Sequence, residues 1–80
     1  MVCEKVIGKL KDVDIAGKTV EYVDIEWHEA FKKIHRKVTG QGREVGIRMD
    51  DSILTRGLFQ DDVIYDADGV VIVVNTRRAK

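Results

Sequence analysis

The chain has 80 residues and room for one small hydrophobic core, so it forms a single domain. Its 14 basic residues balance 14 acidic ones, which disfavours the basic face typical of nucleic-acid modules. A single Cys excludes an intramolecular disulfide framework and favours a reducing compartment such as the cytoplasm. The longest apolar run, Val70 to Val74, is too short to cross a bilayer, and no secretory signal is evident.

Three segments in the first two thirds of the chain alternate apolar and polar residues, a pattern that predicts half-buried strands. Their apolar positions are Val2, Val6 and Leu10, then Val23, Ile25 and Trp27, and then Val45, Ile47 and Met49. Ile7 interrupts the strict alternation of the first segment.

Residues 27–38 fit two patterns. Trp27, Phe31, Ile34 and Val38 share a helical spacing, but Gly40-Gln41-Gly42 is typical of a hairpin connector that needs a strand before it. We therefore expect a short helix over Glu29 to Lys33 and then a strand with Ile34, Arg36 and Val38 on one face.

The segment from Asp62 to Thr76 predicts a β-hairpin around Ala67-Asp68-Gly69, in which Gly69 supplies a positive φ. Five consecutive apolar residues, from Val70 to Val74, indicate a central strand that is covered on both faces. Residues 77–80 are expected to form a tail.

Catalytic and metal-binding motifs are absent from the sequence. His28, His35 and Cys3 form no ligand cluster, and Ser52 lacks the surroundings of a nucleophile. The pairs Asp50-Asp51 and Asp61-Asp62 are predicted to cap turns rather than to perform acid–base chemistry. Gly40, Gly42 and Gly46 do not complete a phosphate-binding fingerprint.

The segment from Lys32 to Lys37 carries four positive charges beside Phe31 and is the best candidate for binding RNA or single-stranded nucleic acid. A local acidic counterpart, Asp61-Asp62 with Asp66 and Asp68, makes the domain polarised. Such polarity suits protein partners, because complementary patches steer encounter.

The order of these segments resembles the N-terminal domain of the UreE family of urease accessory proteins. The resemblance rests on short motifs spread over nearly the whole chain: Lys5-Val-Ile-Gly8, Val23-Asp-Ile-Glu-Trp27, Arg36-Lys-Val-Thr39, Gly42-Arg-Glu-Val-Gly-Ile-Arg48 and Leu58-Phe-Gln-Asp-Asp-Val-Ile64. The family commonly has Leu-x-x-Gly-Asp-x-Leu at the last of them, so Asp61 stands where Gly is usual. Asp tolerates a positive φ better than most other residues if the turn requires one.

The resemblance implies a mainly β fold: two small β-sheets packed as a barrel-like or sandwich-like domain with one short helix, similar to the peptide-binding domain of DnaJ-type chaperones. Residues 1–76 would form this domain, and residues 77–80 would be a tail or begin a linker to a C-terminal metal-binding domain. Nickel ligands and the homodimer interface would belong to that missing domain, so no metal or cofactor site is expected here.

By resemblance, the chain is expected to be a non-catalytic, cytoplasmic domain that contacts apo-urease and other urease accessory proteins during nickel delivery. The residues predicted to bind the partner are Glu29, Lys32, Lys33, Arg36 and Lys37. The alternative is a stand-alone β module that binds RNA or single-stranded nucleic acid through residues 32–37.

Overall fold

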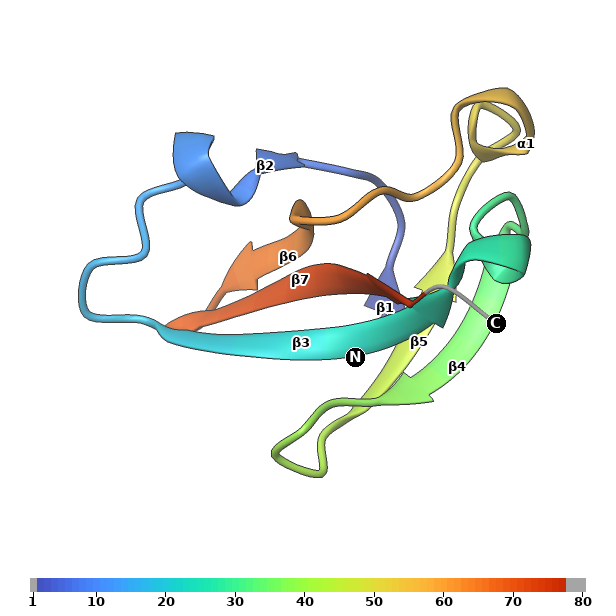
Figure 1. Ribbon diagram of the computed structural model, residues 1–80. Helices are drawn as coiled ribbons and strands as arrows, with labels where there is room; N and C mark the ends of the chain where they lie inside the picture. Colours follow the sequence, from blue (N-terminus) through green and yellow to red (C-terminus); the bar gives the residue numbers. More distant parts are fainter. Residues whose placement is uncertain (1, 78–80) are drawn as a thin grey trace.

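The computed structural model describes residues 2–77, which form two β-sheets packed against each other (Figure 1). The three-stranded sheet has the order β1-β5-β4, and the four-stranded sheet has the order β2-β6-β7-β3. The elements are β1 (Val2–Cys3), β2 (Gly8–Lys9), η1 (Leu10–Asp12), β3 (Thr19–Glu26), η2 (Trp27–Glu29), β4 (Ile34–Val38), β5 (Glu44–Arg48), α1 (Ile53–Arg56), β6 (Asp62–Ala67) and β7 (Val70–Arg77). The mainly β fold with two sheets and one short α-helix is confirmed.

The C-terminal hairpin forms the centre of the four-stranded sheet. Asp68 and Gly69 connect β6 to β7 and both have positive φ, 54° and 76°, which matches the twist of a two-residue hairpin. Strand β7 then pairs with β6 on one side and runs parallel to β3 on the other. Residues Val71 to Val74 are buried on both faces, so the predicted central strand is confirmed.

The three-stranded sheet is built on the predicted hairpin between β4 and β5. Thr39 donates its backbone N–H to the carbonyl of Arg43, and Gly42 turns the chain with a φ of 86°. Strand β1 joins the other edge of β5 in a parallel orientation. The alternation of β5 places Val45, Ile47 and the following Met49 in the core, as predicted.

The main core lies between the two sheets. Both sheets and the connections around α1 contribute its buried side chains, which are Cys3, Val23, Ile25, Ala30, Val45, Ile47, Met49, Ile53, Leu58, Ile64, Ile72 and Val74. A smaller cluster of Val63, Val71 and Val73 lies on the opposite face of β7 under Leu10, Val13 and Val20. Covering both faces of β7 removes its apolar run from water.

Glu21 of β3 is a buried acidic residue that ties the two sheets together. Its carboxylate accepts a hydrogen bond from the Thr39 hydroxyl at 2.7 Å and lies 3.0 Å from Nε of Arg43. These hydrogen bonds, led by the one from Thr39, hold the pKa of Glu21 below its ordinary value against the opposing effect of burial. The end of β4 is thereby fixed beside β3.

Two sequence-based predictions in the middle of the chain were wrong: the helix over Glu29 to Lys33, and the place of Trp27 beside Val23 and Ile25 on the apolar face of a half-buried strand. A single 3₁₀ turn over Trp27–Glu29 replaces the helix expected from Glu29 to Lys33, and Trp27 points to solvent with 56% of its surface exposed. The helical spacing therefore does not mark a buried face. The α-helix lies instead at Ile53–Arg56, where it buries Ile53 and ends at Gly57.

The N-terminal segment is also not one half-buried strand. The chain leaves the three-stranded sheet after Cys3 and joins the four-stranded sheet at Gly8, so the alternation ends near Ile7. Cys3 is buried and Val2 is exposed.

Strand β7 includes Arg77, the first residue of the predicted tail, whereas residues 78–80 lie outside the described part of the chain. Within residues 2–77, no helix is long and apolar enough to span a membrane.

Candidate functional site

The structure divides the predicted partner-binding residues into paired and available groups. Lys37 in β4 lies 3.0 Å from the carboxylate of Glu29, and Lys33 lies 2.8 Å from that of Asp51. Lys32 and Arg36 are exposed and form no ion pair within residues 2–77. The basic segment therefore presents two available cations rather than four.

The hydrogen bond from Lys37 to Glu29 is also the main reason that the pKa of Glu29 lies below its ordinary value, against the effect of partial burial. Glu29 is thus charged and already paired, which makes it a support for β4 rather than a free contact for a partner.

The exposed face of the three-stranded sheet carries more apolar and basic side chains than the sequence predicted. Ile34, Arg36 and Val38 share that face, as expected, and 70% of Ile34 and 58% of Val38 is exposed. In the pairing of β4 with β5, Arg36 lies opposite Gly46 and Ile34 lies opposite Arg48. Arg48 is a further exposed cation that the basic run did not indicate.

A shallow cavity of about 330 Å³ opens over Gly46, which has no side chain to fill it. Val2, Arg36 and Glu44 lie around it, and Val2 reaches this position because β1 pairs with β5 at Gly46. The alternation of β5 alone could have placed Arg48 and Glu44 on one face, but the contribution of Val2 depends on pairing between distant segments.

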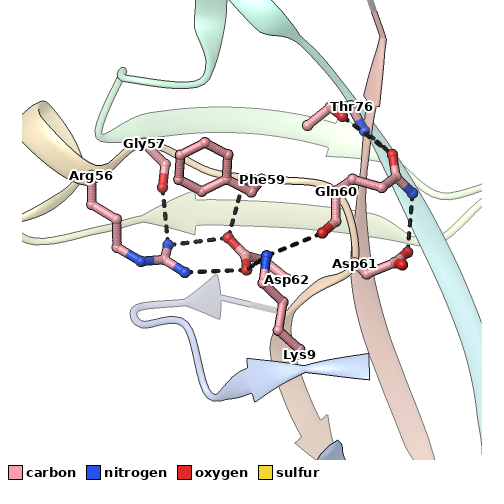
Figure 2. Close-up of polar contacts among 8 residues, drawn as sticks. All are labelled: Lys9, Arg56, Gly57, Phe59, Gln60, Asp61, Asp62 and Thr76. Carbon is pink, nitrogen blue, oxygen red and sulfur yellow. Dashed lines mark hydrogen bonds and ion pairs between the residues drawn. The ribbon is translucent and has the colours of Figure 1, made fainter. Parts of the chain in front are cut away.

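A second polar cluster surrounds Asp62, which is fully buried (Figure 2). The ammonium of Lys9 lies 2.8 Å from its carboxylate, the guanidinium of Arg56 donates to both oxygens at 3.1 and 3.2 Å, and the Phe59 N–H donates at 2.8 Å. Lys9 and Arg56 also lie over the Phe59 ring, 5.5 and 5.7 Å from its centroid.

Burial alone would raise the pKa of Asp62, but the hydrogen bonds from Arg56, Lys9 and the Phe59 N–H outweigh it and hold that pKa below its ordinary value. This carboxylate is charged and already accepts three donors. The predicted turn-capping role is therefore correct for Asp62, but its burial and its two cationic partners were missed. The cluster stabilises the turn before β6 and offers no free group for chemistry.

Asp50 also has the predicted capping role. Its carboxylate accepts the backbone N–H of Ser52 at 2.9 Å and the Ser52 hydroxyl, and the hydroxyl bond is the main cause of its lowered pKa. Both donor groups of Ser52 thus serve to hold the turn that begins at Asp50.

The potential metal ligands are dispersed. His35 is buried with Nε2 2.9 Å from the Lys32 carbonyl, whereas the exposed His28 lies beside Glu26 at 3.3 Å. Cys3 is buried in the core, and burial raises the pKa of its thiol to about 11. Within residues 2–77, His, Cys, Asp and Glu side chains form no group of three that could hold a metal ion.

Comparison with known proteins places this arrangement in a family. The family model described as "UreE urease accessory protein, N-terminal domain" matches residues 3–77. The chain belongs to this family. The resemblance seen in the sequence is thereby confirmed, and the unusual Asp61 of its last motif adopts a positive φ of 67°, a conformation that Gly enters without strain.

Three relatives illustrate the match, and each is named urease accessory protein UreE. The chain is 40% identical over 75 residues to that of Helicobacter pylori (strain Shi470), 40% over 74 residues to that of Acetivibrio thermocellus, and 37% over 75 residues to that of Helicobacter acinonychis. These alignments cover 92–94% of the chain but only 44–46% of the relatives. The chain thus spans less than half the length of these proteins.

Proposed function

We propose that this UreE N-terminal domain is a non-catalytic protein-interaction domain of a cytoplasmic nickel metallochaperone, and that it contacts apo-urease or other urease accessory proteins. The observation that carries the proposal is the exposed face of the three-stranded sheet, where Ile34, Val38 and Val2 are apolar and where Arg36 and Arg48 form no ion pair with any residue from 2 to 77. Apolar anchors beside charges are typical of protein-binding surfaces. The family supplies the urease context.

Nickel belongs, in this proposal, to the part of the relatives that the chain does not span, and the homodimer interface belongs there too. The state of the local ligands supports this division. His35 is buried against the Lys32 carbonyl, and Cys3 is held as a thiol in the core, whereas a metal ligand must be a thiolate. Calorimetric titration of nickel into the 80-residue chain tests the point, because tight stoichiometric binding would contradict it.

The interaction role is tested by capture. The immobilised 80-residue chain should retain apo-urease or an accessory protein, and the double variant Lys32→Glu, Arg36→Glu should retain at most about one tenth as much, because it reverses two exposed charges. Lys11→Glu is the matched control, since Lys11 is exposed on η1 in another part of the molecule (Figure 1). If a full-length relative captures these proteins and the chain does not, the role fails.

Nucleic-acid binding is less well supported, because Lys33 and Lys37 already neutralise carboxylates. A salt series distinguishes the two functions. RNA binding that is strong at low salt and falls steeply toward physiological salt would favour the alternative.

A further inference from the structure

Among the strands that the structure describes, β4 is at the edge of its sheet and has a neighbour on one side only. It pairs with β5 on one side, where Thr39, just beyond β4, donates its N–H to the Arg43 carbonyl at 2.9 Å. Alternate residues of an antiparallel strand direct their backbone groups to the partner, and the residues between direct theirs away. Ile34, Arg36 and Val38 therefore present their N–H and C=O groups outward, and within residues 2–77 no hydrogen bond reaches those groups.

Charged side chains protect this edge only in part: Arg36 is exposed on it, and Lys37 is half-buried and paired with Glu29. Natural edge strands are also commonly shortened, bulged or broken by Pro, and β4 has none of these features. Strand β4 has five residues, no Pro and an unbroken register with β5. Of its three residues with outward backbone groups, Ile34 and Val38 are apolar and largely exposed. The backbone is thus competent to pair with a further strand.

Arg36 and Arg48 give this edge a positive charge. Arg36 lies opposite Gly46 and Arg48 lies two residues further along β5, so the two arginines are diagonal neighbours, roughly 7–8 Å apart at their backbones. Both are exposed and neither forms an ion pair within residues 2–77. A strand added beside β4 would place one of its own side chains directly next to Arg36.

We propose that the free edge of β4 binds an extended acidic segment of a partner protein by strand addition. The recognised pattern is apolar, any residue, acidic, any residue, apolar, so that the three specified side chains lie beside Ile34, Arg36 and Val38. The backbone bonds supply the pairing and the carboxylate supplies the selectivity. This inference rests on the proposed interaction role and names the site and the chemistry of its partner.

The same observations disfavour two other occupants. In a second copy paired antiparallel about Arg36, the two arginines would lie opposite each other, and like charges in that position are destabilising. Nucleic acid would meet the carboxylate of Glu44, which lies on the same face opposite Val38.

The probe is a synthetic peptide, acetyl-TVTETVT-amide, whose Val, Glu and Val side chains share one face of a strand. Added to the ¹⁵N-labelled 80-residue chain, it should shift the amide signals of Ile34, Arg36 and Val38 most. Arg36→Glu should weaken binding by about tenfold or more, as should replacement of the peptide's Glu by Lys. Lys11→Glu, the exposed control on η1, should leave the affinity within about twofold.

Backbone pairing has its own readout. N-methylation of alternate peptide residues removes the donors of one peptide edge, and the set that faces β4 should abolish binding, whereas the set shifted by one residue should preserve it. Equal effects of both sets would overturn strand addition. The inference would also fail if the largest shifts lay outside β4, if a β4-mediated dimer formed instead, or if polyuridylate bound more tightly than the peptide.

The capture experiment separates this inference from the proposed function. If urease components are retained equally by the natural chain and by Arg36→Glu, the edge is not the site, although the interaction role stands. If the peptide binds as expected and no urease component is retained, the interaction role fails and the acidic-peptide site stands.

Discussion

Replacing Asp62 by Asn tests whether the buried carboxylate stabilises the fold. The substitution keeps the size of the side chain and an oxygen that can accept the Phe59 N–H, but it removes the charge that faces Lys9 and Arg56. Removing one member of a fully buried ion pair typically costs about 3–5 kcal/mol. Here the cost is smaller, because Lys9 and Arg56 are 39% and 40% exposed and their freed charges return to water.

We therefore expect Asp62→Asn to lower the free energy of unfolding by about 2 kcal/mol at pH 7, close to one hydrogen bond to a charged group. For a domain of this size the midpoint of thermal unfolding falls by roughly 8–16 °C. Urea unfolding followed by circular dichroism measures the free energy directly.

The pH dependence gives the reasoning a second check. The folded pKa of Asp62 is below its ordinary value, so its contribution is present above the unfolded pKa of about 3.9 and is lost as pH falls through the folded pKa. The difference between the natural chain and the variant should shrink on acidification from pH 7 toward pH 2.

Asp61→Asn is the matched control. It makes the same chemical change one residue away, where the carboxylate accepts a hydrogen bond from the exposed Gln60 amide, and Asn also tolerates the positive φ. Its effect should stay below about 0.5 kcal/mol. If Asp62→Asn were equally mild, or if its cost persisted unchanged at low pH, the ion cluster would not be stabilising.

Three further predictions address the core and the turns. Gly57→Ala should lower the free energy of unfolding by about 1–3 kcal/mol, because Gly57 has a φ of 75° and a new Cβ would lie 2.9 Å from the Phe31 ring. Gly40→Ala, where a new Cβ would lie in open space, is the control in the same urea titration. Equal effects of the two substitutions would show that Gly57→Ala introduces no strain. Burial lowers the pKa of His35, so this residue stays neutral in the fold at pH values where it already gains a proton in the unfolded chain. The free energy of unfolding therefore decreases as pH falls below the unfolded pKa of about 6.5. The loss of stability between pH 7.5 and 5.5 should accordingly be smaller in His35→Phe, and identical losses would contradict this. With a thiol pKa of about 11, native Cys3 should react with a disulfide reagent at pH 8 on the order of a hundredfold more slowly than in urea, and a fast native reaction would show that the thiol is accessible.

The parts of the fold that the sequence predicted are those set by local chemistry. Asp68 and Gly69 have the residue types of a two-residue hairpin loop, and both adopt positive φ. The alternation in β5 and the apolar run in β7 placed these strands correctly relative to the core. In each case the deciding residues lie within a few positions of one another, so a short window of sequence contains the whole signal.

The parts that were missed depend on residues distant in the chain. Strand β3 pairs in parallel with β7, which follows it by about fifty residues. No short turn connects the two strands, so the sequence between them does not indicate that they pair. Asp62 was predicted only to cap a turn, and no prediction was made for Glu21, because their cationic partners Lys9 and Arg43 are far away in sequence. The helical spacing at Trp27 was misleading because the exposed side chains there have no core to face.

The candidate site combines both kinds of information. Alternation predicted that Ile34 and Val38 share a face, but the free edge follows from the strand order. That edge is also held in place at both ends: Glu21 binds the Thr39 hydroxyl at one end, and Lys33 pairs with Asp51 at the other. A strand that is already ordered loses little conformational entropy when a peptide pairs with it. The polar contacts that the sequence could not reveal therefore serve the proposed site by preparing its backbone for an incoming strand.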